Sequence, residues 1–255
     1  MSAATRIERD YRVRFDEAGP DGRLRSSGYL RFAQDLAWIH SEVAGFDRRF
    51  YAERGLTWLV RAIELDLLED AAYGTELTVS TEVVGFRRVW ARRRSEFRTA
   101  ESERPTAVAI TDWVLLNAAG RPVRPPAQIL AAFGGPPAEF TPLRLPRLEP
   151  NGEPAATVHE FGVRRSELDP MAHVNNAAYL DFMDEHYLGA VRMRHGMPLP
   201  RRYRAEFIRS AAASARLVGR AWAEPRAWCY RLEDDTGDEL LRARLEADPA
   251  SWVGG

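Results

Sequence analysis

Two patterns of alternating apolar and polar residues run along the chain, and each occurs in both halves. Over residues 75–85, apolar or β-branched side chains fall on every second position, which is typical of a strand with one buried face. Over residues 26–43 they fall three and four apart, which predicts an amphipathic helix with Ser26 or Ser27 as its cap. The first half is therefore predicted to run as strand, turn, long helix and several strands.

The second half repeats this order of predicted elements. The predicted strands cover residues 11–15, 75–85, 89–98, 106–117, 159–165, 202–210, 214–224, 227–233 and 239–246, and the predicted helices cover 26–43, 128–133 and 176–194. A long helix followed by a run of antiparallel strands is an α+β unit. Because the helix is apolar over its first turns, we expect a curved antiparallel sheet to wrap around it.

An internal repeat supports this interpretation. At an offset of 150 residues, Val13, Arg14, Glu17, Tyr29, Leu30 and Phe32 recur as Val163, Arg164, Glu167, Tyr179, Leu180 and Phe182. Between the copies, nine prolines fall within residues 121–154, a density that excludes long helices and central strands. We therefore predict a first unit over 1–120, a Pro-rich linker over 121–156 and a second unit over 157–255. Leu143, Leu145 and Leu148 suggest that the linker lies against the surface.

The composition narrows the class of protein. The 255 residues are 45% hydrophobic and 29% charged, which excludes a disordered chain. With 36 basic and 37 acidic residues there is no basic excess that would favour nucleic acid. Cys229 is the single cysteine, so we expect a reducing compartment. No apolar signal segment opens the chain and no apolar run approaches the ~20 residues of a membrane span, so a cytoplasmic protein without membrane contact is predicted.

The strongest chemical signal lies just before the second predicted helix. Asp169 and His173 stand four residues apart in a loop that leads into the helix at Asn176. The N-terminus of a helix presents free backbone N–H groups and a partial positive charge, which can stabilise an oxyanion. A neighbouring carboxylate can direct or deprotonate a water molecule, or attack directly. The groups needed for acyl transfer are thus available without a Ser-His-Asp triad.

This stretch resembles the acyl-acyl carrier protein thioesterases of plants and bacteria, which are tandem hotdog-fold enzymes. Their motif, Asp-x-Asn-x-His-Val-Asn-Asn-x-x-Tyr, is matched by Asp169, His173, Val174, Asn175, Asn176 and Tyr179. A second family segment, Tyr-Arg-x-Glu-Cys, is matched by Tyr203, Arg204 and Glu206. The chain departs from the family at two positions, where Met171 replaces the middle asparagine and Phe207 replaces the cysteine. A thioether donates no hydrogen bond and accepts weakly, so Met171 cannot replace an amide that orients water.

The resemblance implies two fused hotdog units with one active site in the second. In the first unit, Gly19 and Arg23 replace the acid and the histidine, so this unit would supply the acyl pocket. The implied reaction is hydrolysis of acyl-acyl carrier protein thioesters to free fatty acids, in fatty acid biosynthesis. Its partner is the acyl carrier protein, whose phosphopantetheine arm holds the chain, and no metal or organic cofactor is needed. A monomer and a homodimer are equally open.

The resemblance also implies a role for each matched residue. Asp169 would position or activate water, and His173 would hydrogen-bond within the site or steady the substrate carbonyl. Glu206 would act as a second acid or base. Backbone N–H groups over residues 174–176, at Val174, Asn175 and Asn176, would bind the oxyanion.

Each of these residues also has an ordinary structural alternative. Asp169 before a proline can form an Asx turn, and His173 can be a packed, hydrogen-bonded loop residue. Asn175 and Asn176 are preferred helix caps, and Glu206 can be a solvated strand residue. Other functions on the same scaffold are acyl-CoA hydrolysis and, because of Met171 and Phe207, acyl-thioester binding without catalysis. A hotdog dehydratase is less favoured, because its usual His-based dyad pattern is not found.

Two groups of arginines have two alternative roles. The first group is Arg87, Arg88, Arg92, Arg93 and Arg94, and the second is Arg192, Arg194, Arg201, Arg202 and Arg204. Either group can form a solvated strand face, which is favoured for the first, or a docking surface for an acidic carrier protein.

Overall fold

Ten strands form a single antiparallel sheet in the computed structural model, which describes residues 5–134, 140–147, 156–191 and 197–247. The strands are β1 (Arg6–Arg12), β2 (Leu56–Leu67), β3 (Glu76–Arg87), β4 (Trp90–Thr99), β5 (Ala107–Asn117), β6 (Thr157–Gly162), β7 (Arg201–Phe207), β8 (Arg216–Glu224), β9 (Ala227–Asp234) and β10 (Glu239–Glu246). The helices are α1 (Ser26–Val43), α2 (Arg48–Glu53), α3 (Ala127–Phe133), the short 3-10 turn η1 (Arg165–Glu167) and α4 (Asn176–Val191). The predicted α+β class is confirmed.

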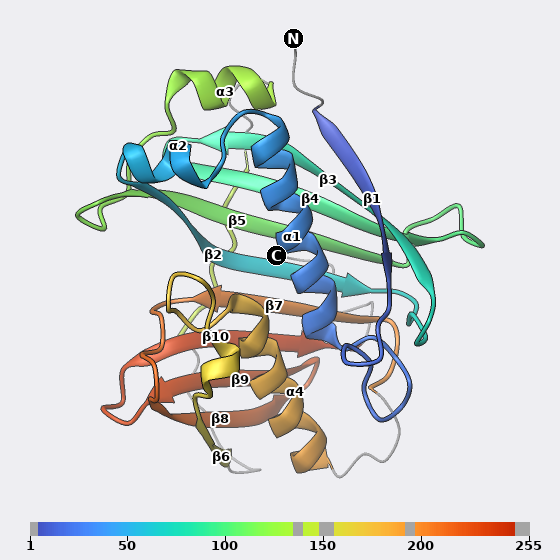
Figure 1. The fold of residues 1–255 in the computed structure, drawn as a ribbon. Helices are drawn as coiled ribbons and strands as arrows, with labels where there is room; N and C mark the ends of the chain where they lie inside the picture. Colours follow the sequence, from blue (N-terminus) through green and yellow to red (C-terminus); the bar gives the residue numbers. More distant parts are fainter. Residues whose placement is uncertain (1–4, 135–139, 148–155, 192–196, 248–255) are drawn as a thin grey trace.

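The sheet consists of two halves with the same strand order. Read from each outer edge to the centre, the order is β1-β3-β4-β5-β2 in the first half and β6-β8-β9-β10-β7 in the second. The halves join where β2 pairs with β7, with Ala62 opposite Glu206. The helices α1 and α4 lie on the same side of the sheet, one over each half, and contact each other (Figure 1). The sheet thus curves around both helices, as the apolar faces of the helices predicted.

Both long helices begin where the sequence places them, but only one has the expected cap. The residue before α1 is Arg25, which makes no side-chain cap hydrogen bond. The prediction that a serine caps this helix was wrong, because the Ser26 hydroxyl donates instead to the Tyr203 hydroxyl at 2.8 Å. At α4, the Asn175 side chain accepts the N–H of Ala177 at 2.9 Å and so provides the cap.

The central strand β2 was not among the predicted strands, and its structure shows the reason. Opposite β5 its register shifts between Val60 and Ala62, which is a β-bulge at Arg61. Before the bulge Val60 packs into the core, and after it Ile63 does. Because a bulge changes which positions face inward, the period of two is interrupted in the middle of the strand.

Two other predicted strands lie further along the chain than the observed ones. Residues 11–15 were predicted for the first strand, but β1 ends at Arg12 and Phe15 is 82% exposed. Likewise, β6 ends at Gly162, and the chain then enters the turn η1. In both copies the apolar residues that suggested a strand lead into the loop before the long helix.

The two helices meet at residues that the internal repeat relates to each other. The Arg31 guanidinium bonds the Asp181 carboxylate at 2.6 Å, and these positions are 150 residues apart. A pair between equivalent positions of two copies must lie near the pseudo-two-fold axis that relates them. Next to it, Tyr203 of β7 donates to Asp184 of α4 at 2.8 Å, and its hydroxyl accepts from Ser26. Polar contacts between the halves therefore accompany the sheet pairing.

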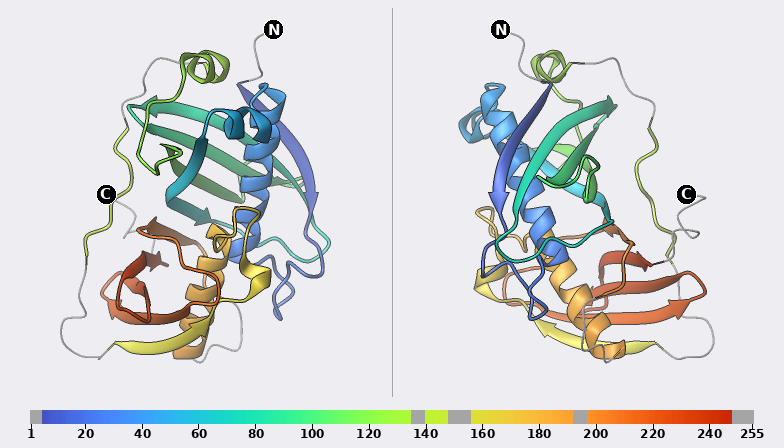
Figure 2. Two further views of the ribbon diagram at one scale, coloured as in Figure 1. Left: turned by 60° about the vertical axis from the view of Figure 1, so that its left-hand side comes forward. Right: turned by 90° about the vertical axis from the view of Figure 1, so that its right-hand side faces the viewer.

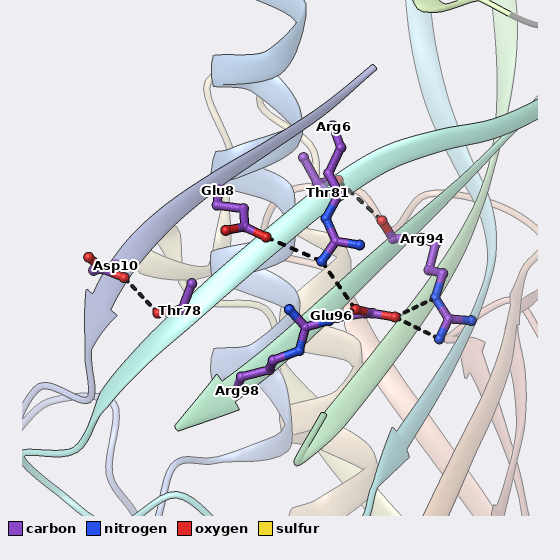
Figure 3. Close-up of polar contacts among 8 residues, drawn as sticks. All are labelled: Arg6, Glu8, Asp10, Thr78, Thr81, Arg94, Glu96 and Arg98. Carbon is purple, nitrogen blue, oxygen red and sulfur yellow. Dashed lines mark hydrogen bonds and ion pairs between the residues drawn. The ribbon is translucent and has the colours of Figure 1, made fainter. Parts of the chain in front are cut away.

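Five arginines of the two basic groups have a carboxylate partner among the described residues, and four of these pairs lie on the outer face of the sheet. Arg6, Arg94 and Arg98 converge on Glu96, as Figure 3 shows. The other described pairs of these groups are Arg92 with Asp112, Arg201 with Asp70, Arg202 with Asp66 and Arg204 with Glu64. Arg192 and Arg194 lie outside the described residues. Arg92, Arg202 and Arg204 pair across neighbouring strands. Arg94 pairs with Glu96 along its own strand, and these four pairs are in keeping with the solvated-face alternative.

Within the described ranges, no helix has both the length and the apolar character needed to cross a membrane.

The carboxyl of Asp184 is expected to make the free energy of unfolding depend on pH. Burial raises its pKa from 3.8 to about 7. Between pH 3.8 and about 7 the folded protein holds a proton on Asp184 that the unfolded chain has lost. The stability that the neutral carboxyl contributes is therefore fully present below pH 3.8 and is lost as the pH rises through about 7. Asp184→Asn should therefore be about 2 kcal/mol more stable than the parent at pH 8, with a smaller difference at pH 5. Urea unfolding at both pH values tests this, and an equal difference at the two would contradict it.

Candidate functional site

The loop between η1 and α4 is held in one shape by its own backbone. The N–H of Asp169 donates to the carbonyl of His173 at 2.8 Å, and the N–H of Asn175 donates to the carbonyl of Glu167 at 2.8 Å. Ala172 closes the turn between them with a positive φ of 60°, and its N–H donates to the Asp169 carbonyl. The candidate acid and histidine are therefore brought side by side at a fixed turn.

The Asp169 carboxylate is oriented by two hydrogen bonds from this turn. Its Oδ1 atom accepts the N–H of Met171 at 2.8 Å and the N–H of His173 at 3.1 Å. This is the Asx turn that the sequence offered as a structural alternative. Both bonds use Oδ1, so among the described residues Oδ2 bonds no donor. The structural and functional alternatives for Asp169 are thus compatible.

The side chains that follow Asp169 face solvent. Met171 is 43% exposed, and His173 is exposed and bonds Asp169 through backbone atoms only, not through its imidazole. No described side chain holds the His173 imidazole in place. A ligand that enters the loop could therefore meet the imidazole without displacing a protein contact.

Not all backbone N–H groups over residues 174–176 remain open to a ligand. The N–H of Asn175 is already bonded to Glu167, and the Asn175 side chain caps α4. That leaves the N–H groups of Val174 and Asn176 as donors at this helix end. Its positive end adds to their attraction for an oxyanion.

The first copy has the same loop backbone without the same side chains. The N–H of Gly19 donates to the carbonyl of Arg23 at 2.8 Å, and Gly22 has a positive φ of 74°. These bonds match those of Asp169, His173 and Ala172 at the offset of 150 residues. Asp21 stands at the position of Met171 and accepts the N–H of Arg23. The repeat is therefore retained in the fold, while the acid and histidine occur in the second copy alone.

Glu206 lies on the other face of the sheet from this loop. Alternate residues of a strand point to opposite faces, and Tyr203 and Phe207 of β7 point to the helices. Glu206 is 4% exposed, and its carboxylate accepts a bond from the Arg144 guanidinium and the N–H of Leu145 at 3.0 Å. The structure does not bring Glu206 together with Asp169.

Those contacts of Glu206 fasten the linker to the outer face of the sheet. Residues 140–147 cross that face, on the side away from α1 and α4 (Figure 2). Asp112 accepts the N–H of Leu143 at 3.0 Å, and Arg242 donates to the carbonyl of Leu145 at 2.8 Å. Leu145 is buried, as predicted, whereas Leu148 lies outside the described residues.

An apolar pocket lies in the first half, between α1 and the inner face of the sheet. It encloses about 520 Å³ of empty space, including the part open to solvent. Its wall includes Trp38 of α1, Trp58 of β2, Phe86 of β3, Ala91 of β4, Trp113 of β5 and Phe133 of α3. The apolar character of this wall suits a hydrocarbon chain.

The pocket and the Asp169 loop lie at the same end of the sheet. Because β2 and β7 are antiparallel, the start of β2, with Trp58, lies at the same end as Phe207 at the end of β7. The ring of Tyr179, in the first turn of α4, packs edge-on against Phe207 with centroids 5.5 Å apart. The Tyr179 hydroxyl also accepts the N–H of Ala211 at 2.9 Å, which fixes this end of the helix to the chain after β7.

Cys229 is not suited to act as a nucleophile. Its side chain is buried, and burial raises the pKa of the thiol to about 12. The thiolate is the reactive form, and almost none is present at neutral pH. Cys229 is therefore an unreactive core residue.

Two family models match the sequence of this chain. The family model described as the acyl-ACP thioesterase N-terminal domain matches residues 5–132, and the acyl-ACP thioesterase C-terminal domain matches residues 152–198. Together they cover more than half of the chain. Comparison with curated protein sequences finds no match.

Solved structures with the same fold cover almost the whole chain. A putative oleoyl thioesterase from Lactobacillus plantarum matches with a TM-score of 0.85 and 16% identity, over 96% of both chains. An acyl-ACP thioesterase from Bacteroides thetaiotaomicron and the 12:0-ACP thioesterase from Umbellularia californica each match with a TM-score of 0.77, over 95% of this chain and 97% of theirs. Their identities to this chain are 13% and 19%. The predicted tandem hotdog fold is confirmed.

Removal of the Glu206 carboxylate is expected to lower stability because it releases the linker. Glu206→Ala leaves the Leu145 N–H without its acceptor and separates Arg144 from a buried partner, so we expect a loss of about 2 kcal/mol. Glu64→Ala is the matched control, since Glu64 pairs with Arg204 at 3.2 Å on the same face but stays partly exposed. It should cost under about 1 kcal/mol. Equal losses in chemical denaturation would show that the linker contacts add nothing.

Proposed function

Because this chain belongs to the acyl-ACP thioesterase family, it is a thioester hydrolase that releases fatty acids from acyl carrier protein, and we propose that Asp169 is its catalytic carboxylate. One observation carries the assignment. A turn at the start of α4 fixes Oδ1 of Asp169 and leaves Oδ2 open, at the end of the sheet where the apolar pocket lies. A fixed carboxylate at the same end of the sheet as an apolar pocket is what a water-activating group for an acyl thioester needs.

In the proposed reaction, Oδ2 of Asp169 accepts a proton from water as the water oxygen attacks the thioester carbon. The carbonyl oxygen becomes an oxyanion, which the N–H groups of Val174 and Asn176 and the start of α4 stabilise. The C–S bond then breaks, and the proton passes to the departing thiolate. The products are a free acid and the thiol of the carrier arm, so atoms and charge balance.

His173 is proposed to act on the substrate rather than on Asp169. Its imidazole is exposed and bonds no described protein group, so it is available to the thioester carbonyl or to the leaving sulfur. Glu206 has no proton-transfer step in this proposal, because its carboxylate is engaged by the linker on the other face of the sheet. We assign it the role of anchoring the linker.

The acyl chain is proposed to enter the pocket of the first half, while the second half carries out the chemistry. This division follows from the two loops, since Gly19 and Arg23 offer neither acid nor histidine. Hydrolysis of acyl-CoA by the same site is the second candidate, because the thioester itself is identical. We place the enzyme in the cytoplasm, where its single cysteine needs no oxidised partner.

Asp169→Asn is expected to abolish turnover without unfolding the loop. The amide oxygen of asparagine can still accept both turn N–H groups, but it cannot take a proton from water. We expect kcat on acyl carrier protein substrates to fall about 10²–10⁴-fold, with little change in melting temperature. Free thiol release over a panel of acyl-carrier proteins and matching acyl-CoAs measures the effect.

Asp21→Asn is the control for that experiment, since Asp21 holds the equivalent turn of the first copy. It should leave kcat unchanged. An Asp169→Asn protein that turns over at the parent rate would remove Asp169 from the mechanism. Equal losses in both variants would show that the turns act only through the fold.

Met171→Asn is expected to raise turnover, because Met171 is exposed beside Asp169 and its thioether cannot orient water. An amide at this position could donate to the water or to the oxyanion, and we expect kcat to rise about threefold to tenfold. Met171→Leu, which adds no polar group, should not raise it. No gain with asparagine would mean that water is oriented by other groups.

A further inference from the structure

One charged side chain stands in the wall of the pocket, whose other lining residues are uncharged and mostly apolar. Arg93 lies on β4 between Arg92 and Arg94, which point to the outer face and pair with Asp112 and Glu96. By the alternation of a strand, Arg93 points inward, where it lines the pocket with Ala91. The sequence places it in a basic run, but its environment is opposite to that of its neighbours.

The Arg93 guanidinium has hydrogen bonds on one side only. Its Nη1 atom bonds Nδ1 of His40 at 2.9 Å and the hydroxyl of Thr81 at 3.2 Å. Arginine only donates, so Nδ1 of His40 is the acceptor in this bond. Within the described part of the chain, Nε and Nη2 of Arg93 bond no acceptor, and neither is sealed from the pocket or solvent.

No carboxylate in the described part of the chain lies within ion-pair distance of Arg93. Burial lowers the pKa of its guanidinium to about 10, so the group is still charged at neutral pH. The ring of Phe133 lies 5.9 Å from the guanidinium carbon and gives weak cation–π support. A charge that is desolvated without a counterion costs free energy, so this wall favours a ligand that brings one.

A second donor in the same pocket lacks a partner. The indole Nε1 of Trp113 is buried and bonds no acceptor in the described structure. Trp113 lies opposite Ala91 on the adjacent strand, so it is the diagonal neighbour of Arg93 on the inner face. Such diagonal pairs are within reach of long and aromatic side chains. The Trp113 donor is buried behind the wall, so the donors open to a ligand are those of Arg93, and a plain hydrocarbon chain could not satisfy them.

We propose that this pocket selects acyl chains that carry an oxygen acceptor near the far end, with a carboxylate preferred over a hydroxyl or keto group. A carboxylate matches both the charge and the forked geometry of a guanidinium. A hydroxyl or keto oxygen satisfies one donor and leaves the charge unpaired. This inference rests on the proposed function, since the pocket must receive the chain of the thioester.

The test compares three ligands that lack the thioester bond and differ at one end. They are methyl dodecanoate, methyl ω-hydroxydodecanoate and monomethyl dodecanedioate, whose ester ends prevent reversed binding through a head-group carboxylate. Trp38, Trp58 and Trp113 line the pocket, so tryptophan fluorescence reports binding directly. We expect the dioate to bind the parent at least about tenfold more tightly than methyl dodecanoate, with the hydroxy ligand between them.

Arg93→Met should remove this preference, because methionine retains an unbranched apolar side chain without the charge. Arg94→Met is the matched control on the same strand, since Arg94 pairs with Glu96 on the outer face, and it should keep the preference. Equal binding of the three ligands to the parent, or a preference that survives in Arg93→Met, would overturn the inference. If Arg93→Met does not fold, the comparison of ligands on the parent still decides.

Hydrolysis of carrier-protein thioesters with the same three chains separates this inference from the proposed function. A binding preference without thiol release would contradict the proposed hydrolysis while supporting the ligand class. Thiol release with the plain chain favoured would support the hydrolysis and contradict the ligand class.

Discussion

The pairing of β2 with β7 is the constraint on which the rest of the molecule depends. It turns two five-stranded halves into one sheet, so neither half leaves a central edge unpaired. It also places α1 beside α4, close enough for Arg31 to bond Asp181 across the pseudo-two-fold axis. Because the strands are antiparallel, the joint brings the end of β7 to the start of β2. The Asp169 loop of one half and the pocket of the other thereby share one end of the sheet.

The two copies of the fold share a loop backbone but differ in the side chains that the loop carries. The loops before α1 and α4 have the same backbone hydrogen bonds and the same left-handed turn residue, at Gly22 and Ala172. The fold needs this turn in both copies, because it sets the start of each long helix. It does not need the acid at Asp169, and Gly19 fills the equivalent place. The backbone is thus fixed by folding, whereas the side chains differ between the copies.

Much of the fold could be predicted from the sequence because it follows from local alternation. The predicted bounds 239–246 coincide with β10, and the helix predicted to run from a cap at Ser26 or Ser27 to about residue 43 matches α1 within two residues. The bulge at Arg61 hid the bounds of β2, since a local pattern cannot show where its period shifts. The motif around Asp169 is contiguous in sequence, so its arrangement at the start of a helix could also be predicted. The position of Glu206 relative to this motif could not be predicted, because it depends on which face of a distant strand Glu206 occupies.

The same dependence on strand parity gives the arginines of β4 their different environments. On the outer face, a guanidinium beside water can pair with a carboxylate of the next strand at little cost, as Arg92 does with Asp112. One position along, the inner face offers Arg93 a hydroxyl, an imidazole and aromatic rings, but no carboxylate among the described residues. A charge is retained there at a cost in folding free energy. The other ion pairs show that this sheet can place a carboxylate beside an arginine. The carboxylate that Arg93 lacks among the described residues is therefore best supplied by a ligand in the pocket.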